Sequence, residues 1–248
     1  MKKIILLLVF WFFDPTSYAT NKIDLVNHFI FSDSTETIHN GVVKQLFKKG
    51  MIEYEKHNYT NAISIWKDVL KDIEGKKDSI NLELSLKTKV NIGATYNALG
   101  YHKTAAEYFL TVKSESEQLK KNDRYWINNI NIGVCYMSLE QYDLAKKYFD
   151  NTKDYNSYII FLKNLNLAKW HGLNNNKDKF LFYQKSISKQ IVNFSMYESV
   201  WEEMQLEFFT LFKDKESLNR LLKQLIPSYK DKNLFLKLQI NTSLLLLN

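Results

Sequence analysis

The sequence predicts an all-α fold, an α-α superhelix built from antiparallel helix pairs. The chain has 248 residues but only seven Gly and two Pro, too few for the many turns of a β-rich protein. A sparse pattern of small and aromatic residues recurs about every 40 residues, which is typical of stacked helical repeats. Helical periodicity of the apolar residues then continues toward the C-terminus.

The first nineteen residues have the three parts of a secretory signal peptide. Two lysines precede an apolar run from Ile4 to Phe13, and the segment ends in Ser-Tyr-Ala with small residues at the expected positions. The apolar run is too short for a membrane-spanning helix, which needs about 20 residues. We therefore expect residues 1–19 to be removed, the mature chain to begin at Thr20, and the protein to be exported, either periplasmic or secreted. A retained anchor or a buried first helix is the alternative.

The repeated pattern follows a lead-in segment, residues 20–40. Each unit has a Gly, an Ala twelve residues later and an aromatic residue four further on. The three sets are Gly50, Ala62 and Trp66; Gly93, Ala105 and Phe109; and Gly133, Ala145 and Phe149. A Gly on one helix and an Ala on the next allow two antiparallel helices to approach closely, and the aromatic ring fills the space beside them. We therefore expect Gly93 to face Ala105, and Gly133 to face Ala145.

This pattern resembles the tetratricopeptide repeat, whose small and aromatic positions fall at these offsets. The resemblance covers about Lys44 to Asp150, and a weaker fourth unit has Ala168 in the Gly place and Phe180 in place of the small residue. It implies about four helix pairs within residues 41–192. The Gly-equivalent positions lie 43, 40 and 35 residues apart. Because these spacings exceed the family's usual unit, the chain is more similar to the long-helix bacterial members, which sense peptides or signal.

Residues 193–248 are predicted to form helices that cap the stack. One segment places Val200, Met204, Phe208 and Leu211 on a single helical stripe, and Pro227 is expected to end the next helix. A last, apolar helix would cover the face that the end repeat otherwise exposes. Core packing is the favoured interpretation of its Leu-rich end, and a dimer or membrane contact through this C-terminal helix is left open.

The residue types that carry catalysis or metal binding do not occur in usable patterns. The five His residues are not at metal-ligand spacing, and there is no Gly-rich phosphate loop and no Gly-x-Ser-x-Gly elbow. Cys135 is the sole cysteine and is expected to be a small buried hydrophobe. The formal charge of +7 comes mostly from lysines that alternate with acids, unlike the clustered arginines of nucleic-acid readers. The sequence thus predicts a protein that is not an enzyme, with no cofactor, metal or nucleic-acid partner.

The resemblance implies a binding groove lined by the first helix of each pair. In the family, the position two residues before the Gly or its equivalent points into this groove, and here it holds Lys48, Asn91, Asn131 and Asn166. An Asn carboxamide can donate to and accept from a peptide backbone, so the three asparagines are candidates for clamping an extended peptide. Further candidate binding residues flank this position: Lys44, Tyr54, Lys87, Asn97 and Met137. The alternative is that the asparagines are structural and bond to neighbouring helices.

Together these features predict an exported repeat scaffold that binds a protein or peptide partner in its concave groove, without catalysis. An alternative is the extracytoplasmic sensor portion of a signalling system, such as a histidine kinase or a transcription regulator. The apolar C-terminus motivates that alternative.

Overall fold

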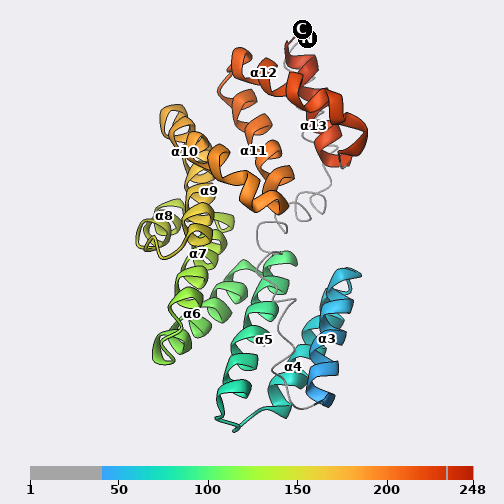
Figure 1. Cartoon of the computed structure of the whole chain (residues 1–248), viewed down its shortest axis with the longest axis vertical. Coiled ribbons are helices and arrows are strands. Elements are labelled where there is room, and N and C mark those ends of the chain that lie inside the picture. The colour runs from blue at the N-terminus through green and yellow to red at the C-terminus, as the bar shows by residue number, and fades with distance from the viewer. Residues whose placement is uncertain (1–40, 233, 248) are drawn as a thin grey trace. The chain divides into compact units, whose positions relative to one another are not determined.

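The computed structural model describes residues 41–232 and 234–247, so the predicted signal peptide and lead-in segment lie outside it. Every regular element among the described residues is a helix, which confirms the all-α class (Figure 1). The chain divides into two compact units, the first ending at Thr152 and the second beginning at Lys153. This boundary lies inside the region predicted as repeats, residues 41–192.

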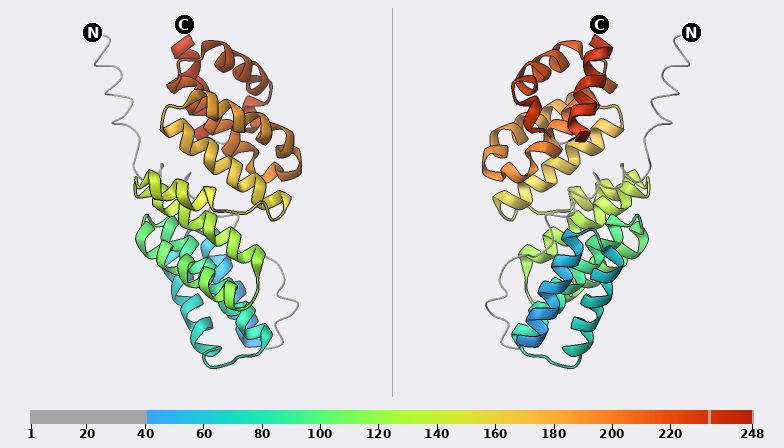
Figure 2. Two further views of the ribbon diagram at one scale, coloured as in Figure 1. Left: turned by 90° about the vertical axis from the view of Figure 1, so that its left-hand side faces the viewer. Right: turned by 90° about the vertical axis from the view of Figure 1, so that its right-hand side faces the viewer.

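The described part of the first unit consists of three helix pairs. They are α3 (Gly41–Glu55) with α4 (Tyr59–Asp72), α5 (Ser79–Ala98) with α6 (His102–Gln118), and α7 (Asn122–Ser138) with α8 (Tyr142–Asp150). Successive helices lie side by side and run in opposite directions (Figure 2). The first unit is therefore the antiparallel helix-pair stack that the sequence predicts.

Burial differs sharply between the first helices of these pairs. α3 buries a single stripe, Val43, Phe47, Gly50 and Tyr54, as expected for an amphipathic helix at a surface. In contrast, residues 90–95 of α5 and 128–135 of α7 are buried without interruption. A helix buried on every side belongs to a core, so α5 and α7 are the central helices of the first unit.

Each pair in the first unit is held by a Gly of the first helix against an aromatic ring of the second. A Cβ added to Gly93 would lie 3.0 Å from Phe109, and one added to Gly133 would lie 2.5 Å from Phe149; Gly50 meets Trp66 in the same way. That Gly93 also faces Ala105, and Gly133 faces Ala145, stays a prediction. The ring one turn beyond the Ala lies across the Gly, and it supplies the nearest atoms.

The same tight turn joins the two helices of each pair. One turn residue has the left-handed backbone conformation: His57, Gly100, Glu140 or Asn175, with φ between 53° and 82°. The next residue's N–H reaches back to the last turn of the first helix, as in Tyr101 N to Tyr96 O at 2.9 Å and Gln141 N to Tyr136 O at 2.9 Å. This is the Schellman arrangement, which satisfies carbonyls at a helix C-terminus. Its repetition fixes the same antiparallel geometry in every pair.

The second unit begins with the pair α9 (Ser157–Leu173) and α10 (Lys177–Gln190). It continues with the 3-10 segment η2 (Ile191–Tyr197), α11 (Glu198–Leu211), α12 (Lys215–Leu225), the 3-10 segment η3 (Ile226–Asp231) and α13 (Leu234–Leu247). Pro227 lies in η3 directly after α12, as predicted. On α11, Met204 and Phe208 are buried but Leu211 is 53% exposed, so the predicted apolar stripe ends one turn early.

In the second unit the Gly contact has a different partner. Gly172 makes a close approach here, since its added Cβ would lie 2.6 Å from Phe208 of α11. Phe180 of α10 is fully buried and packs edge-on against Phe208, with ring centroids 5.2 Å apart. Because a large ring occupies the small-residue position of α10, the aromatic that covers the Gly comes from the following helix instead. Among the described residues, the helices include none that is long and apolar enough to cross a membrane.

Candidate functional site

Three polar residues of α7 lie on one side of the helix. Arg124, Asn128 and Asn131 are spaced by four and three residues, which places them on successive turns of a single stripe. All three are buried, and Asn131 is fully buried. Asn128 Nδ2 donates to the Arg124 backbone oxygen at 2.8 Å. A polar stripe inside a core is unusual, because buried polar groups cost free energy unless they are hydrogen-bonded.

A matching stripe on α5 is joined to it by ion pairs. Glu83, Lys87 and Asn91 are spaced by four residues each, and Lys87 Nζ lies 4.0 Å from Glu83 Oε1. The Arg124 guanidinium contacts the same carboxylate, and Lys121 Nζ lies 3.9 Å from its other oxygen. Glu83 therefore connects α5 to α7. We name these two stripes the polar wall, which consists of Glu83, Lys87, Asn91, Arg124, Asn128 and Asn131.

Asn131 differs from the other asparagines of the polar wall because both polar atoms of its side chain are unpaired among the described residues. Within the part of the chain that the structure describes, neither its Nδ2 nor its Oδ1 has a hydrogen-bond partner, and Asn128 Oδ1 also has none. An unpaired buried polar group costs about 1–3 kcal/mol, and proteins pair nearly all such groups. The wall thus presents donors and acceptors one helical turn apart, the complement of a peptide group's C=O and N–H.

The prediction that the three asparagines present exposed amides is wrong. Asn91 and Asn131 are 0% exposed and Asn166 is 2% exposed. Asn91 Nδ2 lies 3.3 Å from Met51 Sδ of α3, and Asn166 Nδ2 donates to Leu162 O of its own helix at 2.8 Å. Asn91 therefore behaves as the structural alternative expects, whereas Asn166 bonds within its own helix and Asn131 has no partner among the described residues. Peptide binding by these residues stays a prediction.

The other candidates are mostly buried as well. Lys48 is exposed and Lys44 is half-buried. The four buried ones are Tyr54, Lys87, Asn97 and Met137. Tyr54 packs against Tyr59, with ring centroids 5.1 Å apart, and Asn97 Oδ1 lies 2.8 Å from His102 Nδ1 across the α5–α6 turn. Tyr54 and Asn97 thus stabilise the turns within their helix pairs.

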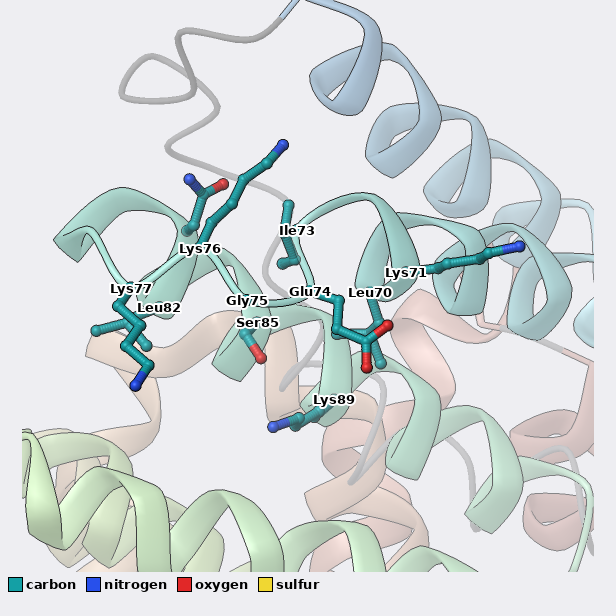
Figure 3. Close-up of a pocket in the computed structure, with 11 residues that line it drawn as sticks. Leu70, Lys71, Ile73, Glu74, Gly75, Lys76, Lys77, Leu82, Ser85 and Lys89 are labelled. Carbon is teal, nitrogen blue, oxygen red and sulfur yellow. The ribbon is translucent and has the colours of Figure 1, made fainter.

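A solvent-open hollow of about 480 Å³ lies at the turn between α4 and α5 (Figure 3). Its charged lining residues are Lys71, Lys76, Lys77, Lys89 and Glu74. Lys89 forms an ion pair with Glu115 of α6 at 2.5 Å. Aspartates at positions 68, 72 and 78 belong to the same segment, so the lysine charge is balanced locally. The hollow is therefore a weaker candidate for ligand binding than the polar wall.

The described residues offer little for covalent or metal chemistry. Among them, no group of three or more His, Cys, Asp or Glu side chains is arranged to hold a metal ion. Cys135 is fully buried, and burial raises the pKa of its thiol. Since the thiolate is the nucleophilic form of cysteine, Cys135 is unreactive near neutral pH.

Sequence reasoning missed three members of the polar wall, Glu83, Arg124 and Asn128. A signal existed for Asn128, because it stands one turn before Asn131 on the same helix. Arg124 is one of only two arginines, and Arg is the residue preferred in buried ion pairs. The role of Glu83 follows from the packing of α5 beside α7, which links residues 41 positions apart.

Comparison with protein families gives one match, within the third helix pair. A family model described as tetratricopeptide repeat matches residues 128–151, which contain Asn131, Gly133 and Phe149. This match covers one helix pair of the stack, and it agrees with the resemblance to tetratricopeptide repeats that the sequence pattern of that pair implies. Comparison with curated proteins gives no match.

Among solved structures, the chain is similar to a Rap protein crystallised in complex with competence and sporulation factor. The two chains are 15% identical, with a TM-score of 0.44. The similarity covers 81% of this chain and 71% of the Rap chain.

Proposed function

We propose that this protein is an exported, non-catalytic scaffold that binds an extended protein or peptide segment at the polar wall of α5 and α7. The observation that carries the proposal is the fully buried carboxamide of Asn131, which has no hydrogen-bond partner among the described residues. Tetratricopeptide repeats are interaction scaffolds, and a backbone amide supplies the donor and the acceptor that this side chain needs. The three-part N-terminal segment supports export.

The chemistry of recognition follows from the positions along α7. Asn131 Nδ2 donates to a backbone C=O of the bound segment, and Asn131 Oδ1 accepts from a backbone N–H. Asn128 Oδ1, one turn earlier, accepts a second N–H. The ion pairs of Glu83 hold α5 and α7 in register, so the carboxamides are positioned before the partner arrives. Recognition of this kind reads the backbone rather than the side chains.

Burial of the wall adds a kinetic expectation. Since Asn131 is 0% exposed, a partner reaches it only when the packing over α5 and α7 opens. Binding that requires a conformational change associates more slowly than rigid docking. We therefore expect slow association, with a rate set by the opening of the stack.

The proposal is tested by capture from an extracytoplasmic fraction, with quantification by mass spectrometry. Wild-type protein, the Asn131→Leu variant and the surface control Lys223→Ala serve as baits. We expect a partner that the wild type and Lys223→Ala retain equally and that Asn131→Leu loses. A partner retained equally by all three baits would contradict the assignment of the wall.

A further inference from the structure

In the second unit, α10 and the η2 segment that follows it expose large apolar side chains. Val192 is 83% exposed and Phe182 is 66% exposed, and these are the two most exposed large hydrophobic side chains among the described residues. Met196, which follows the kink at Phe194, is 58% exposed. Single exposed apolar residues are common on protein surfaces, but a group of them on adjoining elements is typical of an interaction site.

These residues share a helical stripe with lysines. Phe182, Lys185, Lys189 and Val192 are spaced by three, four and three residues, and Ile191 has helical dihedral angles (φ −57°, ψ −30°), so the stripe continues to Val192. The opposite side of α10 holds Phe180 and Ile187, which are fully buried. We name the exposed stripe of Phe182, Lys185, Lys189 and Val192 the α10 ridge.

The ridge carries positive charge that no acid on the described chain neutralises. The ion pair that α10 forms joins Lys177 to Asp214 at 2.9 Å. Lys185 and Lys189 have no acidic partner among the described residues. Lys179 adds a third ammonium beside the ridge, 5.8 Å from the centre of the Phe182 ring. Asp178, in the first turn of α10, is the acid closest in sequence to the ridge.

We propose that the α10 ridge docks onto an anionic membrane surface. Phe182 and Val192 enter the boundary between headgroups and acyl chains. Lys185 and Lys189 lie between them on the same stripe, and their long stems allow the ammonium groups to reach lipid phosphates. This is an interfacial contact along one helix, and it is independent of both the polar wall and any membrane-spanning segment.

The shape of the ridge favours a lipid surface over an acidic protein. Side chains that are 83% and 66% exposed protrude from the molecule, so a protein partner would need a groove matched to them. A bilayer interface instead deforms around any protruding apolar group. Lysine near an anionic surface strengthens binding by roughly fivefold per residue, and salt weakens this contribution.

The test uses the full chain with a fluorescent probe beside the ridge. Ser188 of α10 is exposed, and Ser188→Cys can be labelled selectively with a polarity-sensitive dye because Cys135 is fully buried. The matched control is Thr60→Cys, exposed on α4 of the first unit. The probe membranes are vesicles of phosphatidylcholine with roughly 30% phosphatidylserine, and vesicles of phosphatidylcholine alone. Since the dye reports its own surroundings, binding through the N-terminal apolar run does not produce the signal.

We expect the dye at position 188 to shift to the blue with anionic vesicles, and the dye at position 60 to stay unchanged. The double variant Lys185→Gln with Lys189→Gln should bind the anionic vesicles about 25-fold more weakly, because each lysine contributes about fivefold. The equal charge change Lys103→Gln with Lys147→Gln, at exposed sites of the first unit, has little effect. Phe182→Ser with Val192→Ser abolishes the shift.

Three results would overturn the proposal. The first is vesicle binding without a shift at position 188, or with an equal shift at position 60. The second is equal weakening by the two lysine pairs, which would mean attraction by net charge alone. The third is a shift produced by an acidic polyglutamate peptide and not by vesicles, which would assign the ridge to an acidic protein partner. Circular dichroism of each variant confirms that it folds.

Discussion

A Cβ atom added to Gly133 of α7 would lie 2.5 Å from Cε1 of Phe149, a fully buried ring of α8. Real Cβ atoms do not approach a ring this closely, so the Gly133→Ala variant must move Phe149 or separate the two helices. We expect this variant to lower the free energy of unfolding by roughly 1–3 kcal/mol, as overpacked cores do. Urea denaturation measures the change.

A matched control separates packing from helix propensity. Gly41 begins α3, and nothing lies within 4 Å of its added Cβ. Gly41→Ala should therefore be neutral or slightly stabilising, because Ala favours helix over Gly by about 1 kcal/mol. If both variants changed stability alike, the contact between Gly133 and Phe149 would not hold the pair together.

Replacing Asn129 or Asn131 of α7 with Leu should change the stability of the protein in opposite directions. Asn131→Leu removes a buried carboxamide that has no hydrogen-bond partner among the described residues, and should raise the free energy of unfolding by about 1–3 kcal/mol. Asn129→Leu breaks bonds to Tyr148 O at 2.6 Å, to Thr152 Oγ1 at 2.9 Å and from Lys113 Nζ at 2.7 Å. Asn129→Leu should therefore lower the free energy of unfolding by at least about 1 kcal/mol.

Chemical denaturation of the two variants side by side decides this point. Equal destabilisation would mean that Asn131 is as well bonded as Asn129. Asn131 would then be structural, and the peptide-binding assignment of the polar wall would lose its main observation.

Low pH should destabilise the N-terminus of α5, because it protonates the capping carboxylate of Asp78. This residue caps the helix and accepts from Asn81 N at 3.0 Å, and that bond, with the Asn81 side chain, holds the pKa of the carboxyl below its ordinary value of 3.8. A lowered pKa in the folded state stabilises the fold above the unfolded value, and the contribution is lost as the pH falls through the folded value. The stability advantage of wild type over Asp78→Ala should therefore shrink below about pH 4.

The Asp78→Asn variant is the control for that titration, because Asn is also a good N-cap but does not ionise. Melting temperatures of the three proteins at neutral pH and at low pH give the comparison. If the gap between wild type and Asp78→Ala stayed constant down to pH 2, the capping carboxylate would not be linked to stability.

Export predicts that the N-terminal segment is cleaved from the chain. If residues 1–19 are a signal peptide, N-terminal sequencing of protein from expressing cells should begin at Thr20. Replacing Leu6 and Leu7 with Arg should interrupt the apolar run and leave the chain uncleaved. An intact Met1 on wild-type protein that remains inside the cell would show that the proposal of export is wrong.

The fold was largely predictable because its signals are local. The 16-residue distance from Gly133 to Phe149 recurs from Gly93 to Phe109 and sets one helix pair each time. The aromatic ring was not predicted as the nearest neighbour of each Gly, because spacing alone does not tell whether the Ala or the ring one turn further lies closest. In the second unit, the partner of Gly172 is Phe208 of α11, a contact that the pattern of repeats does not contain.

The candidate site was less predictable because it depends on contacts distant in sequence. Asn91 and Asn131 were identified by their offset from Gly, yet their burial depends on how α5 and α7 are packed on every side. The ion pair between Glu83 and Arg124 joins residues on different helix pairs. Neither residue belongs to the repeated pattern, so only the assembled stack shows that they adjoin the asparagines.

Isothermal titration tests the central claim, that Asn131 reads the backbone of a bound segment, most directly. The titrant is a synthetic peptide covering the segment of the captured partner that binds best, and the proteins are wild type, Asn131→Leu and Lys223→Ala. Loss of two hydrogen bonds, each worth about 0.5–1.5 kcal/mol, should weaken binding to Asn131→Leu by roughly fivefold to more than a hundredfold. The Lys223→Ala control should match wild type. Equal affinity of all three proteins for the peptide would contradict a role for the polar wall in binding.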